Sequence, residues 1–347
     1  MKKILVCLPL IAFLSGCGVS SSDGVVTRSA NSDNVFGLTD ASDVSVTGES
    51  AVKNVNDVVI GSFKVGFVES GKQVNQAKGT FMKRAMGGNA KGNVKLEGVS
   101  SAEMQAVTEA AYRDFVGKLQ AKGFNVVNRS QFTSSDDYAN MSKDKYPMET
   151  DSSGFLSSYG KTVFYQPAAF GSEGISFAND IPKEQTGTGF LSGIQNTMSV
   201  RGDMKAASFA EESKVAVVSA TYVVDFAAAG GHAGISSASV VVGQNLAVTQ
   251  GSVKIISGGS DSFTNGTAVF ALGQPVESGQ SFGEVINDTS DADVAVQEVT
   301  NVASIFMGQG TNRSRDYIVK ADPQKYMNYA ADVLTKANDR LLSSIKK

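Results

Sequence analysis

The sequence predicts an α/β (α+β) fold, in which a mixed sheet combines a β-α-β unit, an antiparallel meander and a C-terminal helix. Three observations predict it. A strand, an amphipathic helix and a second strand follow one another within residues 57–128; short apolar strands separated by turn sequences occupy residues 214–272; and a long helical pattern closes the chain. With 347 residues, the chain is long enough to bury a sizeable core.

The β-α-β unit begins with a strand at residues 57–68. Its first part is continuously apolar, and its second part alternates apolar residues with Ser62, Lys64 and Gly66. Such alternation is typical of a half-buried strand, so it predicts that Lys64 faces the solvent side. The following residues, 70–99, are rich in Gly, Lys and Asn, and we expect a loop or a weak hairpin there.

The helix of this unit has clear start and stop signals. Ser100 and Glu103 form a capping-box pattern, in which each side chain can satisfy a free backbone N–H group. Gly123 supplies a residue suited to the left-handed conformation that often ends a helix. Apolar residues at 124–127 then predict a second strand. Because parallel strands need a crossover connection, the helix predicts that the two strands pair in parallel.

The predicted meander consists of four strands joined by short turns. The strands are expected at residues 214–226, 239–248, 252–257 and 267–272. The turns are expected at Gln250-Gly251, at residues 257–260 and at Asn265-Gly266, where the residue types favour tight turns.

Two further helices are predicted near the C-terminus. The first covers residues 284–308, with apolar positions at Val294, Val296, Val299 and Val302. The second begins after Asp322, an N-cap residue followed by a proline at the first helical position. Its apolar residues form one stripe that continues to Ile345, which predicts a strong amphipathic helix at the end of the chain.

Residues 130–200 form a long irregular insertion, with three prolines, many Gly and Ser residues and scattered aromatic residues. A structureless loop of this length is uncommon in a compact domain, so we expect short elements within it. The aromatic side chains are candidates for contact with a neighbouring subunit. A small satellite core is the alternative.

The N-terminus carries an export signal. Two lysines precede a short apolar run that is too short to span a bilayer as a helix. The run ends in Leu14-Ser15-Gly16-Cys17, which resembles the bacterial lipobox at all four positions. The resemblance implies that residues 1–16 are removed, and that Cys17 becomes the lipidated N-terminus with three acyl chains, palmitate among them. An ordinary secretory signal with an incidental cysteine is the alternative.

Residues 17–50 are predicted to tether the lipid to a periplasmic domain at residues 51–347. The segment is rich in Ser, Asp, Gly and Thr and has few large apolar groups, so it lacks the surface needed to order itself. An ordered arm on the domain surface is the alternative. Gly18 replaces the aspartate that keeps related lipoproteins in the inner membrane. We therefore expect an outer-membrane location, with the domain facing the periplasm.

The side chains do not assemble a recognisable chemical site. The mature chain keeps only Cys17, which excludes an intramolecular disulfide and a cysteine-based metal site. The only histidine, His232, lies in a Gly-rich turn sequence, and the carboxylates of Asp136, Asp137, Glu211, Glu212 and Asp225 are expected in turns or in solvent. We expect no catalytic residues, no cofactor and no metal. No basic stripe indicates a nucleic-acid partner.

The order of elements resembles the periplasmic domain of the curli-secretion-channel lipoprotein family. The resemblance is carried by DVVIGSFKVGFV, by the helix and strand from Ala102 to Phe132, and by SKVAVVSATYVVDFAAAGGHAG with NLAVTQGSVKIISGG. It covers about half of the chain. It implies a ring-forming scaffold of the cell envelope, a homo-oligomer that works with other envelope or secretion proteins.

Two other functions stay open. Some members of that family insert β-hairpins into the outer membrane as an export pore, and residues 226–253 and 262–276 contain no Asp, Glu, Lys or Arg. However, these strands alternate poorly and lack an aromatic girdle, which a lipid-facing strand would show. The third reading, an envelope hydrolase, has no assembled catalytic set.

Overall fold

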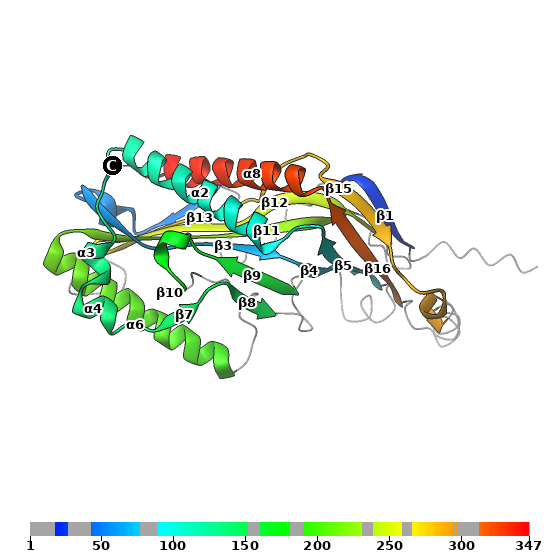
Figure 1. The fold of residues 1–347 in the computed structure, drawn as a ribbon, viewed down its shortest axis with the longest axis horizontal. Helices are drawn as coiled ribbons and strands as arrows, with labels where there is room; N and C mark the ends of the chain where they lie inside the picture. The colour runs from blue at the N-terminus through cyan, green and yellow to red at the C-terminus, as the bar shows by residue number, and fades with distance from the viewer. Residues whose placement is uncertain are drawn as a thin grey trace, which may run out of the picture.

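The computed structural model of the chain describes residues 18–26, 43–76, 89–151, 160–178, 180, 190–230, 239–258, 266–294, 296–297 and 312–346. Within these residues the fold is α+β, with helices on both faces of a mixed sheet (Figure 1). The predicted fold class is therefore confirmed. The predicted lipidation site, Cys17, lies outside the described residues, as does His232.

The central sheet has ten strands. Its main path runs β2-β13-β12-β11-β3-β9-β8, while β1 and β14 also pair with β12, and β6 pairs with β3. The strands are β1 (Gly18–Val25), β2 (Val44–Thr47), β3 (Asp57–Val68), β6 (Asn125–Val126), β8 (Met148–Asp151), β9 (Lys161–Tyr165), β11 (Ala216–Gly230), β12 (Ser239–Ile256), β13 (Thr267–Leu272) and β14 (Val276–Glu277). A short 3-10 helix, η1 (Glu49–Val52), follows β2.

The predicted β-α-β unit is confirmed. Helix α2 (Ser101–Ala121) connects β3 to β6, which pair in parallel. The capping box is present, because Ser100 Oγ accepts from Glu103 N at 3.4 Å and the Glu103 carboxylate accepts from Ser100 N at 2.6 Å. Strand β11 lies parallel to β3 on its other side, and the meander continues antiparallel through β12 and β13.

One face of the sheet is covered by α2 and by the predicted C-terminal helix, α8 (Pro323–Ser343), which lie side by side (Figure 1). Asp322 caps α8 by accepting from Lys325 N at 3.0 Å. Buried side chains of both helices join the main core, including Phe115 of α2 and Tyr326 of α8. The buried Asn338 of α8 donates to Ala111 O at 3.2 Å, which ties the two helices together.

The opposite face is covered by elements of the predicted insertion and by one helix that the sequence did not predict. These elements are α3 (Ser130–Thr133), α4 (Asp136–Ala139), β7 (Lys143–Lys145), β10 (Glu173–Ile175) and α6 (Phe190–Ser213). The short 3-10 helix η2 (Ala168–Phe170) instead contacts α2, because Ala168 N donates to Glu109 at 2.6 Å and the Phe170 ring packs on Tyr112. A second hydrophobic cluster gathers here, with Phe132, Tyr138 and Phe177 in the insertion and Phe209 on α6. The satellite core of the sequence analysis is therefore present, although β8 and β9 of the insertion belong to the central sheet.

A second sheet of four strands, ordered β15-β16-β5-β4, lies at one end of the molecule (Figure 1). Its strands are β4 (Ser70–Gln76), β5 (Asn89–Glu97), β15 (Gly283–Asn287) and β16 (Asn312–Ala321). The hairpin expected within residues 70–99 is thus present. The helix predicted at 284–308 is wrong at its start, which is β15; residues 291–294 and 296–297 are helical. Val299 and Val302 lie outside the described residues.

The turn predicted at Gln250-Gly251 is wrong, because β12 runs through it as a single strand. The register with β11 shifts between Val223 and Val224, whose partners are Gln250 and Val248, so Thr249 is the extra residue of a bulge. A Cβ at Gly251 would lie 2.8 Å from Leu272 Cδ1 and 3.2 Å from Tyr222 Cδ1. Close packing, and not a turn, requires this glycine.

The tether predicted at residues 17–50 differs from the structure in its described part. Strand β1 pairs in parallel with β12, and β2 pairs with β13. The apolar surface of this segment is small, but a strand of any composition can satisfy the backbone groups along the edge of β12.

The described uncharged residues at 226–229 and 240–253 are largely buried inside the protein. Phe226, Val242 and Leu246 are fully or almost fully buried. The second sheet packs closely on this hairpin, since a Cβ on Gly92 of β5 would overlap the Val242 side chain of β12. Burial against protein therefore accounts for the missing charges without any contact with lipid.

Replacing Gly92 by alanine is expected to lower the free energy of unfolding by about 1–3 kcal/mol, because the added methyl group would overlap Val242. Chemical unfolding followed by circular dichroism measures the change. Gly117→Ala in α2 is the control, because no atom lies within 4 Å of its added Cβ. Equal stabilities of the two variants would contradict close packing between the sheets.

Candidate functional site

The predicted lipid-bearing residue can be located through its neighbour. Gly18, the residue after Cys17, is the first residue of β1, and its Cα pairs with that of Ser239 at the start of β12. Gly230, at the end of β11, pairs with Val241 at the same end of this hairpin. A lipid on Cys17 would therefore lie next to one end of the central sheet, called here the anchored end.

The second sheet reaches the same end of the molecule. Asn89 at the start of β5 pairs with Asn312 at the start of β16, and with Gln76 at the end of β4. Because Gly92 packs against Val242, the starts of β5 and β12 lie close together. Figure 1 shows β1, β5, β15 and β16 at this end, far from α3 and α4.

The inner end of β1 is fixed by two neighbouring residues of β12, one through its backbone and one through its side chain. Val26 N donates to Gln244 O at 3.3 Å, and Asn245 Nδ2 donates to Val26 O at 3.0 Å. The fully buried Gln244 amide in turn accepts from Phe282 N and Gly283 N, both at 2.8 Å. These contacts connect the N-terminal strand, the central sheet and the start of β15.

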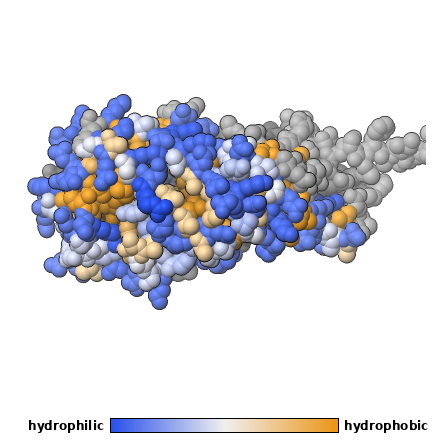
Figure 2. Space-filling view, turned by 45° about the horizontal axis from the view of Figure 1, so that its top comes forward, coloured by the Kyte–Doolittle hydropathy of each residue, from blue (hydrophilic) through white to orange (hydrophobic). Residues whose placement is uncertain are grey.

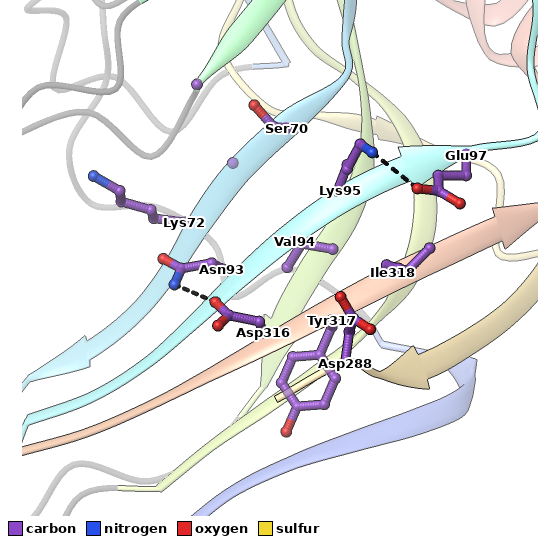
Figure 3. Close-up of a pocket in the computed structure, with 12 residues that line it drawn as sticks. Ser70, Lys72, Asn93, Val94, Lys95, Glu97, Asp288, Asp316, Tyr317 and Ile318 are labelled. Atoms are coloured by element: carbon purple, nitrogen blue, oxygen red, sulfur yellow. Dashed lines mark hydrogen bonds and ion pairs between the residues drawn. The ribbon is translucent and has the colours of Figure 1, made fainter. Parts of the chain in front are cut away.

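A hollow of about 400 Å³ lies on the outer face of the second sheet (Figure 3). Its charged lining residues come from three strands and one loop: Lys72 of β4, Lys95 and Glu97 of β5, Asp316 of β16, and Asp288. Asn93 Nδ2 donates to Asp316 at 2.6 Å, and Lys95 pairs with Glu97 at 2.9 Å.

The hollow is open to solvent and is lined by both charged and apolar groups. The hydrogen bond and charge of Glu97 raise the pKa of Lys95, so its ammonium stays charged and paired. The side chains of Lys95 and Glu97 are well exposed, and an exposed pair of this kind is screened by water. This surface can accept a polar ligand by hydrogen bonds, but it does not place a nucleophile beside a base.

A second polar cluster is buried between the sheet and β10. Lys64 of β3 pairs with Asp180 at 3.3 Å, and the two side chains are only 1% and 2% exposed. Lys64 Nζ also donates to Ile175 O at 3.3 Å and to Ser176 Oγ at 3.0 Å. The Asp180 carboxylate accepts from Ser219 Oγ at 2.8 Å. All of these groups are thus satisfied within the protein.

The prediction that β3 is half-buried, with Lys64 facing the solvent, is wrong. Strand β3 is buried on both faces, because the insertion covers the side on which Ser62 and Lys64 point. Burial alone would lower the pKa of Lys64, but the neighbouring acidic groups of Tyr146, Asp180 and Asp144 raise it above its usual value. No local sequence signal identified Asp180 as its partner.

A second, partly buried pair lies next to the first. Lys254 of β12 donates to Asp203 of α6 at 3.0 Å and to Ala178 O at 2.6 Å, while Ala178 N donates to Asp203 at 3.0 Å. Burial raises the pKa of Asp203, although Lys254 opposes this effect. The two pairs hold the segment after β10 between the sheet and α6, and they indicate a structural role.

We expect stability to fall as the pH rises above about 10, where unfolded Tyr and Lys lose their protons. Burial raises the pKa of Tyr222 and Tyr326, so the folded state keeps phenol protons that the unfolded state releases. The raised pKa of Lys64 has the same sign: its stabilisation is complete below the unfolded pKa, and it is lost as pH rises through the folded pKa. Denaturant unfolding at increasing alkaline pH measures this fall.

The double variant Tyr222→Phe and Tyr326→Phe serves as a control for the alkaline effect. It removes both buried phenols, so its stability should depend less on pH over the same range. A wild-type stability that stays constant through this range would contradict the assignment.

The carboxylates considered in the sequence do not form a metal-binding group. Asp137 pairs with Lys205 at 3.2 Å, and Asp225 accepts from Ala227 N at 3.3 Å. Glu211 and Glu212 are exposed near the end of α6. Within the described residues, no three His, Cys, Asp or Glu side chains are arranged to hold a metal ion. Among the helices of the described ranges, none is long and apolar enough to cross a membrane.

Comparison with protein-family models, with curated proteins and with solved structures finds no match for this chain.

Proposed function

We propose that this chain is a non-enzymatic, lipid-anchored protein of the outer membrane that acts as an oligomeric scaffold or ring component of the cell envelope. The observation that carries the proposal is the pairing of Gly18 with Ser239. It links the predicted lipid on Cys17 directly to the sheet, so the protein would be held at the membrane in a defined orientation and not on a loose tether.

A structural role is supported by the buried charges. Lys64, Asp180, Lys254 and Asp203 bind one another and neighbouring backbone groups, instead of facing a cavity. The described uncharged residues of β11 and β12 are buried against protein, which gives their lack of charge an explanation other than an export pore. A rigid domain at a fixed distance from a membrane suits a scaffold.

Assembly into a ring is supported by the edges of the central sheet. Among the described strands, β2 pairs only with β13, and β8 pairs only with β9. These two strands lie at the two ends of the sheet's main path, the positions at which a sheet can be extended by another chain. Joining unlike edges of successive copies is a heterologous contact, which closes into a ring when the rotation between copies permits.

Electron microscopy of the detergent-solubilised, lipidated full-length protein tests the proposal. Rings or other defined oligomers are expected. A protein that stays monomeric at high concentration, and captures no envelope partner, would overturn the scaffold function. Conductance across a planar bilayer would instead favour the export pore, and hydrolysis of an envelope polymer lost on substitution of Asp225 would favour the hydrolase.

A further inference from the structure

The most exposed large apolar side chain in the described part of the chain is Val296, at 66%. The others are Val46, Met204 and Ile286, which belong to three separate elements. Figure 2 shows apolar residues as separate patches on a mostly hydrophilic face. Single exposed apolar residues are common, so exposure alone does not indicate a contact surface. What distinguishes Val296 is its position in the fold.

Val296 belongs to the short helical segment that precedes β16. Its neighbour Gln297 accepts from Ser314 N at 2.8 Å and from Arg315 Nη1 at 3.0 Å, which holds the segment against the start of β16. Ser314 pairs with Lys91 of β5, one residue from Gly92. Since Gly92 packs on Val242, Val296 lies at the anchored end, on the side of the second sheet.

We propose that Val296 contacts the phospholipid leaflet that holds the acyl chains of Cys17. The inference rests on the proposed lipid anchor, and it adds a protein surface that touches the membrane. The short strand β1 leads from Cys17 into the sheet, so the anchored end faces the leaflet. One valine adds little membrane affinity beside three acyl chains. Its contact with the leaflet instead determines how the domain is oriented on the membrane.

The membrane surface that Val296 contacts is a phospholipid bilayer whose headgroups carry no net charge. Asp291 and Asp293 precede Val296 in the same segment, and Arg315 binds Gln297 beside it, so charges of both signs surround the valine and favour neither a strongly anionic nor a cationic surface. A zwitterionic headgroup such as phosphatidylcholine carries no net charge, so it allows the valine to approach the acyl region.

The absence of tryptophan from the chain permits a clean test. Val296→Trp places a single tryptophan at the proposed contact, and Met204→Trp places one on α6, where the native side chain is 55% exposed. Met204 lies two residues from Ala206, which packs in the second core with Val217 at the far end of β11. Residues 217–230 of β11 span about 40 Å, so the control is far from the anchored end.

Both lipidated variants are reconstituted in phosphatidylcholine vesicles, with and without lipids that carry a shallow nitroxide quencher. The Val296→Trp emission is expected to shift to the blue relative to the same variant with Cys17→Ser in buffer, and the nitroxide should quench it. The Met204→Trp emission should neither shift nor be quenched. Circular dichroism confirms that each variant folds.

Two results would overturn the inference. An unshifted and unquenched Val296→Trp, on protein that floats with the vesicles, would reject the contact while leaving the lipid anchor intact. A blue shift without quenching would place the residue in a protein–protein contact. Failure of the protein to float with vesicles would instead reject the anchor itself.

Discussion

Replacing Cys17 by serine is expected to move the protein from the membrane fraction to the soluble periplasmic fraction. The serine hydroxyl cannot take the thioether-linked lipid, and each buried CH₂ of an acyl chain contributes about 0.8 kcal/mol of membrane binding. Cell fractionation measures the location, and mass spectrometry of the N-terminal peptide measures the lipid.

The matched control for this experiment is Cys7→Ser, the other cysteine of the chain. Cys7 lies within the segment predicted to be removed, so the substitution should leave location and lipidation unchanged. Membrane association that survives Cys17→Ser would contradict the anchor. A mature protein that begins at another residue would contradict the lipobox assignment.

Replacing Asp180 by alanine is expected to produce the largest loss of stability among the charged residues of the buried clusters. Removing one partner of a buried pair typically costs about 3–5 kcal/mol, because the other charge stays buried without compensation. Here that charge is the ammonium of Lys64, whose side chain is 1% exposed. A fall in Tm of roughly 10 °C, or failure to fold, is expected.

Two further variants distinguish the loss of the buried Lys64–Asp180 pair from other effects of substitution on stability. Glu97→Ala breaks the exposed pair with Lys95 and should change stability by less than about 1 kcal/mol. The double variant Lys64→Met and Asp180→Leu removes both buried charges and should recover much of the loss. If Asp180→Ala were as stable as Glu97→Ala, the buried pair would not exist in solution.

The elements that the sequence predicted well are those with local signals. Helix α2 has a capping box at Ser100, and α8 has an N-cap at Asp322, so their starts can be found from neighbouring residues. Strand β3 and the parallel β-α-β unit follow from an apolar run joined to a helix. The resemblance to the curli-secretion-channel family stays a prediction, as does the lipidation of Cys17.

The features that sequence reasoning missed depend on contacts between distant segments. Gln250 and Gly251 have the residue types of a turn, but cross-strand packing with Tyr222 keeps β12 continuous. Lys64 has the spacing of a solvent-facing residue, but Asp180, 116 positions away, covers it. The pairing of β1 with β12 depends on an open sheet edge, which no property of β1 itself reveals.

The parallel pairing of β1 with β12 also has a mechanical consequence. If Cys17 carries the proposed lipid, a pull on that lipid would act along the axis of β1, away from the sheet. The hydrogen bonds between Gly18–Ser22 and their partners on β12 are then loaded together in shear, instead of opening one after another as in a peeled hairpin. The pairing of β1 with β12 would therefore resist a pulling force from the membrane better than its small number of hydrogen bonds suggests.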